Sequence, residues 1–390
     1  MKADRARVVV LGMMANVPAA GHTWLHLNWL RGIQMLGHEV WFVEDELSWP
    51  YDPVQGTRTD DYSYTLAYIR SCLERINLED HWAFRVAERR GNSWGLSDDE
   101  LDDLYASCDV LINLEGSTEL RDVHMAAPLR VLVETDPAGD QLKIANGDAD
   151  ARRVYETHHV RFTYGENYGA PDCEVPLDGL NYLKTRQPVD LELWPMAYTP
   201  DAELFTTMGA YRQHGREVEY QGKLWTWSKH HEWERYIELP QRTSQRFQLA
   251  LAGYDDADRR RLESHGWRVI PVEPLSDDLG AFGDYMRNSR GEFTVVKEQY
   301  YKLRTGWFSE RAASYLASGK PVVTQATGFE NVLPTGEGLF AVSTSEEAAA
   351  AIEEINGDYR RHCRAARAIA EEHFEASKVA GRMFAELGFG

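Results

Sequence analysis

The chain has 390 residues, of which 43% are hydrophobic, and its formal net charge at pH 7 is −20. This length is typical of two domains, and the hydrophobic content excludes wholesale disorder. The acidic balance disfavours nucleic acid and anionic membrane surfaces as partners, because both bind to basic patches.

Cysteine content and hydropathy exclude further classes of protein. The four cysteines are scattered without a CxxC pair, which disfavours a zinc site or a disulfide framework. No segment reaches the ~20 apolar residues of a membrane helix. We therefore expect a cytoplasmic protein without stable membrane insertion.

The first part of the chain alternates predicted strands and helices. A β-branched run at 7–14 predicts a buried strand, residues 22–36 place apolar side chains at helical spacing, and 38–45 predicts a second strand. Together they form a β-α-β unit with the crossover helix that parallel strands require. Further strands are predicted at 109–116, 130–137 and 160–167.

The alternation stops near residues 190–205 and then begins again. The segment that starts at "KLWTWSK" is predicted to begin extended and become helical, and strands are predicted at 247–253, 267–272 and 291–297. This pattern predicts an α/β fold with two doubly wound domains around a cleft. We place the domains at 1–200 and 201–375, followed by a terminal segment at 376–390.

Residues that follow the predicted strands are candidate site residues, because ligands of open α/β sheets bind beyond the carboxyl ends of the strands. His22, Glu115 and Asp136 are candidate catalytic residues, since an imidazole or a carboxylate there can take a proton from a hydroxyl group. Each can instead serve only as a helix cap or in a turn. Four further residues at this edge are predicted to bind the acceptor: Glu134, Tyr164, Glu166 and Asn167.

The stretch "RTGWFSERAASYLASG" places a Gly-containing turn before a helix N-terminus, which is a favourable site for an anion. Arg304 adds positive charge, and Ser309 can cap the helix or bind a phosphate oxygen. Glu310 and Ser314 lie one turn apart on one face, where a carboxylate can bind the hydroxyl groups of a ribose. The acidic runs "DDAD", "TDDY" and "SDDELDD" are more typical of solvated helix starts than of a metal site, and we predict no metal ligands.

The segment "YLASGKPVV", followed by "ATGFENVLPTGEGLFAV", resembles the donor-binding half of GT-B-fold glycosyltransferases, in the branch with an EAxAxGxPVV motif. "LRGIQMLGHEVWFVED" resembles their first helix and second strand, and "HFEASKVAGRMFAEL" resembles their terminal helix. The resemblance implies two Rossmann-like domains and a C-terminal helix that crosses back to the first domain. It also implies an acceptor in the first domain, a nucleotide-sugar donor in the second, and no metal or cofactor.

The resemblance also assigns donor-binding residues. It places the diphosphate-binding turn at Thr305, Gly306, Trp307 and Phe308, and a basic pair at Lys223 and Lys229. The family's motif glutamate falls on Ser314, so that its ribose-binding role can have moved to Glu310. With the residues derived above, the predicted donor site comprises Lys223, Lys229, Arg304, Thr305, Gly306, Trp307, Phe308, Ser309, Glu310 and Ser314.

These features predict a metal-independent glycosyltransferase that moves a sugar from a nucleotide-diphosphate sugar to a hydroxyl of a small molecule or glycan. A nucleotide-sugar epimerase on the same fold and a noncatalytic nucleotide-sugar binding protein remain alternatives. A dinucleotide oxidoreductase is disfavoured, because the first strand leads into "MMANVPAAGH" and not into GxGxxG.

Overall fold

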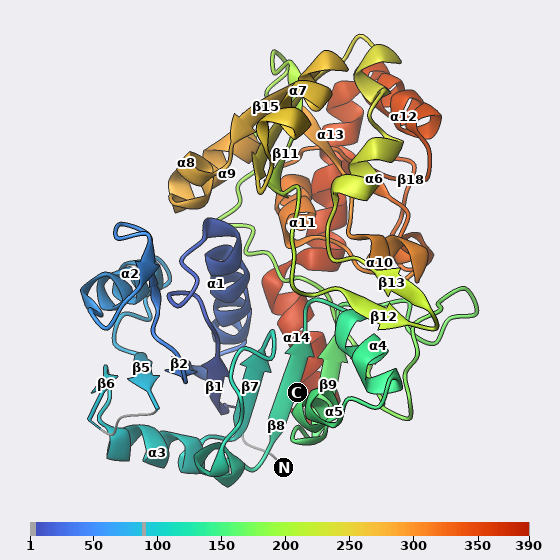
Figure 1. Ribbon diagram of the computed structural model, residues 1–390. Helices are drawn as coiled ribbons and strands as arrows, with labels where there is room; N and C mark the ends of the chain where they lie inside the picture. The colour runs from blue at the N-terminus through green and yellow to red at the C-terminus, as the bar shows by residue number, and fades with distance from the viewer. Residues whose placement is uncertain (1–4, 88–90, 390) are drawn as a thin grey trace.

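Two sheets organise the chain in the computed structural model, which describes residues 5–87 and 91–389 (Figure 1). Helices flank both sheets, and the chain completes the first sheet before it begins the second. The α/β fold class with two doubly wound, Rossmann-like halves is confirmed. Among the helices of the described ranges, none has the length and apolar character needed to cross a membrane.

The first sheet has eight strands, of which all but the edge strand β6 run parallel to their neighbours. In spatial order they are β10 (Leu183–Lys184), β9 (Val160–Thr163), β8 (Arg130–Glu134), β7 (Val110–Leu114), β1 (Arg7–Leu11), β2 (Glu39–Glu46), β5 (Trp82–Val86) and β6 (Ser93–Trp94). The chain builds outward in one direction from β1 and then in the other from β7. The crevice between these two strands is the position where such sheets bind ligands.

The second sheet has six strands, all parallel, and is built outward in two directions like the first. In spatial order they are β15 (Trp267–Pro271), β14 (Arg246–Ala252), β11 (Leu204–Ala210), β16 (Gly291–Thr294), β17 (Val322–Gln325) and β18 (Leu339–Val342). The chain adds strands outward from β11 to β15 on one side and then from β16 to β18 on the other, so that the strand order reverses between β11 and β16. The central strand β11 was not predicted, and the predicted extended start at "KLWTWSK" instead contributes β13 (Lys223–Trp225) to a separate hairpin with β12 (Val218–Tyr220).

Helices cover both faces of each sheet (Figure 1). With the first sheet lie α1 (Ala20–Met35), α2 (Ser63–Glu74), α3 (Asp98–Ser107), α4 (Gly139–Ala145) and α5 (Ala149–Glu156), and a short hairpin joins β3 (Tyr51–Asp52) to β4 (Thr57–Arg58). With the second lie α6 (His230–Arg235), α7 (Asp256–Ser264), α8 (Glu273–Ser276), α9 (Leu279–Arg287), α10 (Glu298–Lys302), α11 (Glu310–Ala317), α12 (Ser345–Gly357) and α13 (Tyr359–Ile369).

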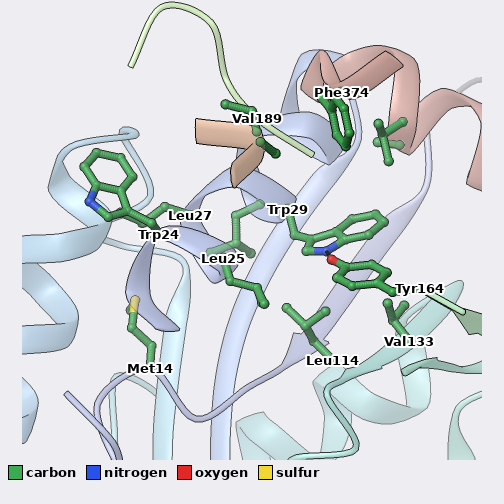
Figure 2. Packing of buried hydrophobic residues seen from close by; sticks show 14 of the residues in the cluster. Met14, Trp24, Leu25, Leu27, Trp29, Leu114, Val133, Tyr164, Val189 and Phe374 are labelled. Carbon is green, nitrogen blue, oxygen red and sulfur yellow. Dashed lines mark hydrogen bonds between the residues drawn. The ribbon is translucent and has the colours of Figure 1, made fainter. Parts of the chain in front are cut away.

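Helix α1 is at the centre of the apolar core. Its side chains Trp24, Leu27 and Trp29 are buried among residues from β7, β8 and the C-terminal part of the chain (Figure 2). The indole Nε1 of Trp29 donates a hydrogen bond of 2.8 Å to the hydroxyl of Tyr164. Because most of its side chains are buried, α1 packs against helices of both halves at once.

The last helix, α14 (Ala376–Glu386), packs back on α1, as predicted (Figure 1). A Cβ atom built on Gly32 of α1 would lie 2.6 Å from the carbonyl oxygen of Ala376, so that glycine permits the close approach of the two helices. The connecting segment is tied to the same place. Val189 donates a backbone hydrogen bond to Phe374, and Ala376 donates one to Val189.

Candidate active site

The carboxyl ends of the two sheets face each other across a cleft that holds two adjoining cavities. Their volumes are about 480 Å³ and about 640 Å³. Residues that follow β1, β7 and β8 line one wall, and residues at the ends of β11 and β16 line the other. The side chains of His22, Glu115, Asp136 and Lys297 line both cavities.

Glu115 follows β7 in a strained backbone conformation. Its φ is +64°, which is unusual for a residue other than glycine and costs of order 1 kcal/mol or more. Only 11% of its side chain is exposed, and its Oε2 atom is buried without a hydrogen-bond partner in the described part of the chain. That oxygen lies 3.6 Å from Nδ1 of His22 and 3.7 Å from Nε2 of His26.

Of these two histidines, His26 has both ring nitrogens in contact with backbone atoms. Its Nδ1 lies 2.7 Å from the backbone oxygen of His22, and its Nε2 accepts a hydrogen bond of 3.2 Å from the backbone N–H of Met13. Burial lowers the pKa of His26, which agrees with a neutral ring whose Nδ1 is the donor.

His22, in the first turn of α1, is the histidine available to Glu115. Its side chain is 41% exposed toward the cleft. The structure therefore brings the predicted residues His22 and Glu115 together. An imidazole close to a carboxylate can take a proton from a hydroxyl group in the cleft.

Asp136, the third predicted catalytic residue, forms a contact across the cleft. Its Oδ1 lies 3.0 Å from Nζ of Lys297 and accepts a hydrogen bond from the hydroxyl of Tyr300. Burial acts to raise the pKa of Asp136, but the positive charge of Lys297 and these hydrogen bonds hold it below its ordinary value. Asp136 is thus an ionised carboxylate that joins the two walls of the cleft.

Two cations flank the end of β11. A Cβ atom built on Gly209 would lie 3.6 Å from Nη1 of Arg311 and 3.8 Å from Nζ of Lys229. The side chain of Lys229 lines the smaller cavity, and its Nζ forms no hydrogen bond or ion pair with any residue in 5–87 and 91–389. Burial, followed by the charges of Arg311 and Lys297, lowers the pKa of Lys229 to about 7. An unpaired cation here can hold an anionic ligand.

The N-terminus of α11 borders the same cavity. Ser309 is the N-cap residue, but its side chain accepts no capping hydrogen bond, and Glu310 and Ser314 also line the cavity. Burial raises the pKa of Glu310 to about 8, and the charges of Asp136 and Glu115 add to this effect. A raised pKa favours the protonated form of the Glu310 carboxyl, and that form can donate a hydrogen bond.

Other predicted donor-site residues lie away from the cavities. Lys223 lies over the ring of Trp225 on the β12–β13 hairpin, and Arg304 forms an ion pair of 2.7 Å with Asp172. Trp307 does line the smaller cavity. Its neighbours in the predicted turn are buried, namely Thr305, Gly306 and Phe308.

This turn joins the two halves of the molecule. The backbone N–H of Asn167 donates to the oxygen of Thr305, and a Cβ atom on Gly306 would lie 2.3 Å from the nitrogen of Asn167. With a φ of +82°, Gly306 meets both a steric and a conformational requirement for glycine. The indole of Trp307 adds a hydrogen bond of 2.8 Å to the oxygen of Thr135.

Of the four residues predicted to bind the acceptor, only Glu134 lines one of these two cavities. It accepts hydrogen bonds from three side chains of its own half: Gln141, Tyr155 and Thr163. Burial raises the pKa of Glu134 to about 7. The other three have structural partners: Tyr164 with Trp29, Glu166 with Arg186, and Asn167 with Thr305.

Sequence analysis missed Lys297 and Arg311. Lys297 closes the predicted strand at 291–297, so that the strand-end rule applied to the first domain would have found it. Arg311 follows Glu310 directly and carried no separate signal. No group of three or more His, Cys, Asp or Glu side chains in the described part of the chain is arranged to hold a metal ion.

No protein-family model and no curated protein sequence matches the chain. Solved structures nevertheless share its fold over the whole length. An α-glucosyltransferase in complex with UDP and a 13-mer DNA has a TM-score of 0.59 at 11% identity and covers 100% of both chains.

Two further structures are similar. The Anabaena protein HepE, in complex with UDP and glucose, has a TM-score of 0.56 at 13% identity, with 98% of this chain and 99% of that chain covered. Sucrose-phosphate synthase from Thermosynechococcus elongatus has a TM-score of 0.53 at 12% identity, with 98% and 99% covered. The chain has the GT-B fold of these glycosyltransferases, and the predicted fold is confirmed.

Proposed function

We propose that the protein is a metal-independent glycosyltransferase, without a cofactor, that moves a sugar from a nucleoside-diphosphate sugar to a hydroxyl of a small molecule or glycan. One observation carries the proposal. The His22–Glu115 pair and the unpaired Lys229 come from opposite halves of the molecule and line one cavity. A base for an acceptor and a cation for a leaving phosphate thus border the same space.

Lys229 and the N-terminus of α11 form the donor side in this proposal. As the bond between the anomeric carbon and the phosphate oxygen breaks, its electron pair goes to the phosphate and negative charge grows there. A fixed cation and helix amides stabilise that charge more in the transition state than in the ground state. Glu310 and Ser314 line the same cavity and would bind hydroxyl groups of the donor.

His22 and Glu115 form the acceptor side. The acceptor oxygen bonds to the anomeric carbon while His22 takes its proton, and the carboxylate of Glu115 stabilises the resulting imidazolium. The strained backbone of Glu115 supports this role, because such strain persists mainly where a functional geometry requires it.

The donor class is supported by the similar structures. HepE was solved with UDP, with UDP and glucose, and with UDP-glucose, and the α-glucosyltransferase was solved with UDP. UDP-sugars are therefore the first donors to test, followed by GDP-, TDP- and ADP-sugars.

The test is an assay of nucleotide sugars in a chelating buffer, with a mixture of sugar and phenolic acceptors. We expect release of one nucleoside diphosphate together with a new glycoside. Conversion of the donor into an epimer without nucleotide release would instead identify an epimerase. Binding of a nucleotide sugar without either product would identify a noncatalytic binding protein.

A further inference from the structure

Three cationic side chains surround the donor side of the cleft, and two of them have their own anion. Nε of Arg311 lies 2.6 Å from Oε1 of Glu292, and its Nη1 donates to the backbone oxygen of Met208. Nζ of Lys297 lies 3.0 Å from Asp136 and 3.4 Å from the ring centre of Trp227. Lys229 has no such partner among the described residues.

The charged groups that face Lys229 come from three further elements. Arg311 belongs to α11, Glu292 and Lys297 lie in and after β16, and Asp136 follows β8. The two carboxylates already balance the two other cations. A charge on Lys229 is therefore uncompensated in a partly buried position, and a neutral amine is favoured until an anion arrives.

We propose that Lys229 is a titrating phosphate ligand, so that a diphosphate enters this cleft together with one proton. The neutral amine takes the proton from solvent, becomes an ammonium group, and pairs with the phosphate oxygens. When the diphosphate leaves, the amine returns the proton to solvent. This inference rests on the proposed donor site and adds to it a dependence of diphosphate affinity on pH.

The lowered pKa of Lys229, at about 7, agrees with this role. At pH 8 the amine is then about nine-tenths neutral in the free protein. Above pH 7 the dissociation constant of a diphosphate should rise by up to about tenfold per pH unit, because each binding event must draw one proton from a scarcer pool. The two neighbouring cations are already paired, Lys297 with Asp136 and Arg311 with Glu292.

The matched variant is Lys229→Arg, because arginine keeps the charge but does not titrate in this range. Inorganic pyrophosphate is a suitable probe, since it carries the diphosphate without a base or sugar. Its binding to both proteins is measured by calorimetry at pH 8 in Tris and in HEPES, which differ in ionisation enthalpy. The ligand's own change of protonation is common to both proteins and cancels in the comparison.

We expect the wild-type protein to take up about one proton more than Lys229→Arg. Equal proton counts in the two proteins would overturn the inference and leave the donor site standing. If neither protein binds pyrophosphate or any nucleoside diphosphate, the proposed donor site fails and the inference fails with it.

A second measurement decides the case in which Lys229→Arg alone loses binding. The lysine side chains are labelled with ¹³C at the ε position, and the Lys229 signal is followed by NMR during a pH titration of the wild-type protein. We expect a midpoint near 7 that moves upward when pyrophosphate is added. A midpoint in the ordinary range of lysine, or one that pyrophosphate does not move, would overturn the inference.

Discussion

Glu115 combines a left-handed backbone with a nearly buried carboxylate. Glycine adopts this backbone without strain, so the release of about 1 kcal/mol of strain should offset the entropy that glycine gains in the unfolded chain, and Glu115→Gly should leave the free energy of unfolding nearly unchanged. The same variant should lose turnover. Chemical denaturation and a kinetic assay measure the two effects.

The control is Glu119→Gly, at an exposed position four residues further on, where no positive φ favours glycine. It should lose about 0.5–1 kcal/mol and keep its activity. If Glu115→Gly destabilises the protein as much as this control does, the backbone of Glu115 stores no strain.

The pair of His22 and Glu115 leads to a second residue-scale prediction. Replacing His22 by Ala removes the proposed base, which should lower turnover by about 10²–10⁴-fold while the affinity for the donor stays the same. Steady-state kinetics and equilibrium binding of the nucleotide separate the two quantities. A His22→Ala enzyme with full turnover would place the base elsewhere, or indicate a route in which the leaving phosphate accepts the proton.

At the scale of elements, the contact between α1 and α14 depends on one glycine. In an isolated helix, Gly32→Ala would stabilise by up to about 1 kcal/mol. Here the new Cβ would lie 2.6 Å from the carbonyl oxygen of Ala376, and such overpacking costs about 1–3 kcal/mol. We expect a net loss of stability, measured as a lower midpoint of denaturation.

Gly381 of α14 is the matched control, because a Cβ there would meet only Leu36, at an ordinary 3.7 Å. Gly381→Ala should therefore stabilise the protein by about 0.5–1 kcal/mol. If both alanine variants are stabilising, the two helices do not pack as closely as the structure places them.

Some strands could be predicted from the sequence and others could not. Apolar runs and their spacing predicted β1, β7, β8 and β14, because these strands are rich in β-branched or aliphatic residues. Strand β11 was not predicted, although it is a central strand of the second sheet. Its Thr206 and Thr207 are buried with their hydroxyl groups bonded to distant side chains, and no local pattern reveals such bonds.

The candidate site likewise has features that the sequence could predict and features that it could not. Strand ends singled out His22 and Glu115 as candidates, and a family resemblance singled out Lys229, but neither could show which side chains remain unpaired. The ion pair of Asp136 with Lys297 joins residues 161 positions apart, so it depends on how the two sheets are placed. The hydrogen bond between Asn167 and Thr305 also depends on that placement. It joins the two halves, and neither residue lines a cleft cavity.

At the scale of the whole molecule, Asp136 and Lys297 connect the two halves. The pKa of Asp136 is lowered in the folded protein, so its contribution to stability is present above its unfolded pKa and is lost as pH falls through the folded value. Asp136→Asn should remove up to about 1 kcal/mol at pH 7, because the pair is partly exposed. Denaturation of both proteins at pH 7 and pH 3 measures this, and an unchanged difference between the two pH values would contradict it.

The central claim is that a nucleotide-sugar donor binds where Lys229 faces the His22–Glu115 pair. It is tested most directly by thermal-shift titration of the wild-type protein and Lys229→Met with UDP, GDP, TDP, ADP and their sugar conjugates, without metal. The exposed Lys378→Met on α14 is the control. We predict that one nucleotide raises the melting temperature of the wild-type and control proteins and has little effect on Lys229→Met. No shift with any nucleotide, or an equal shift in Lys229→Met, would contradict the account.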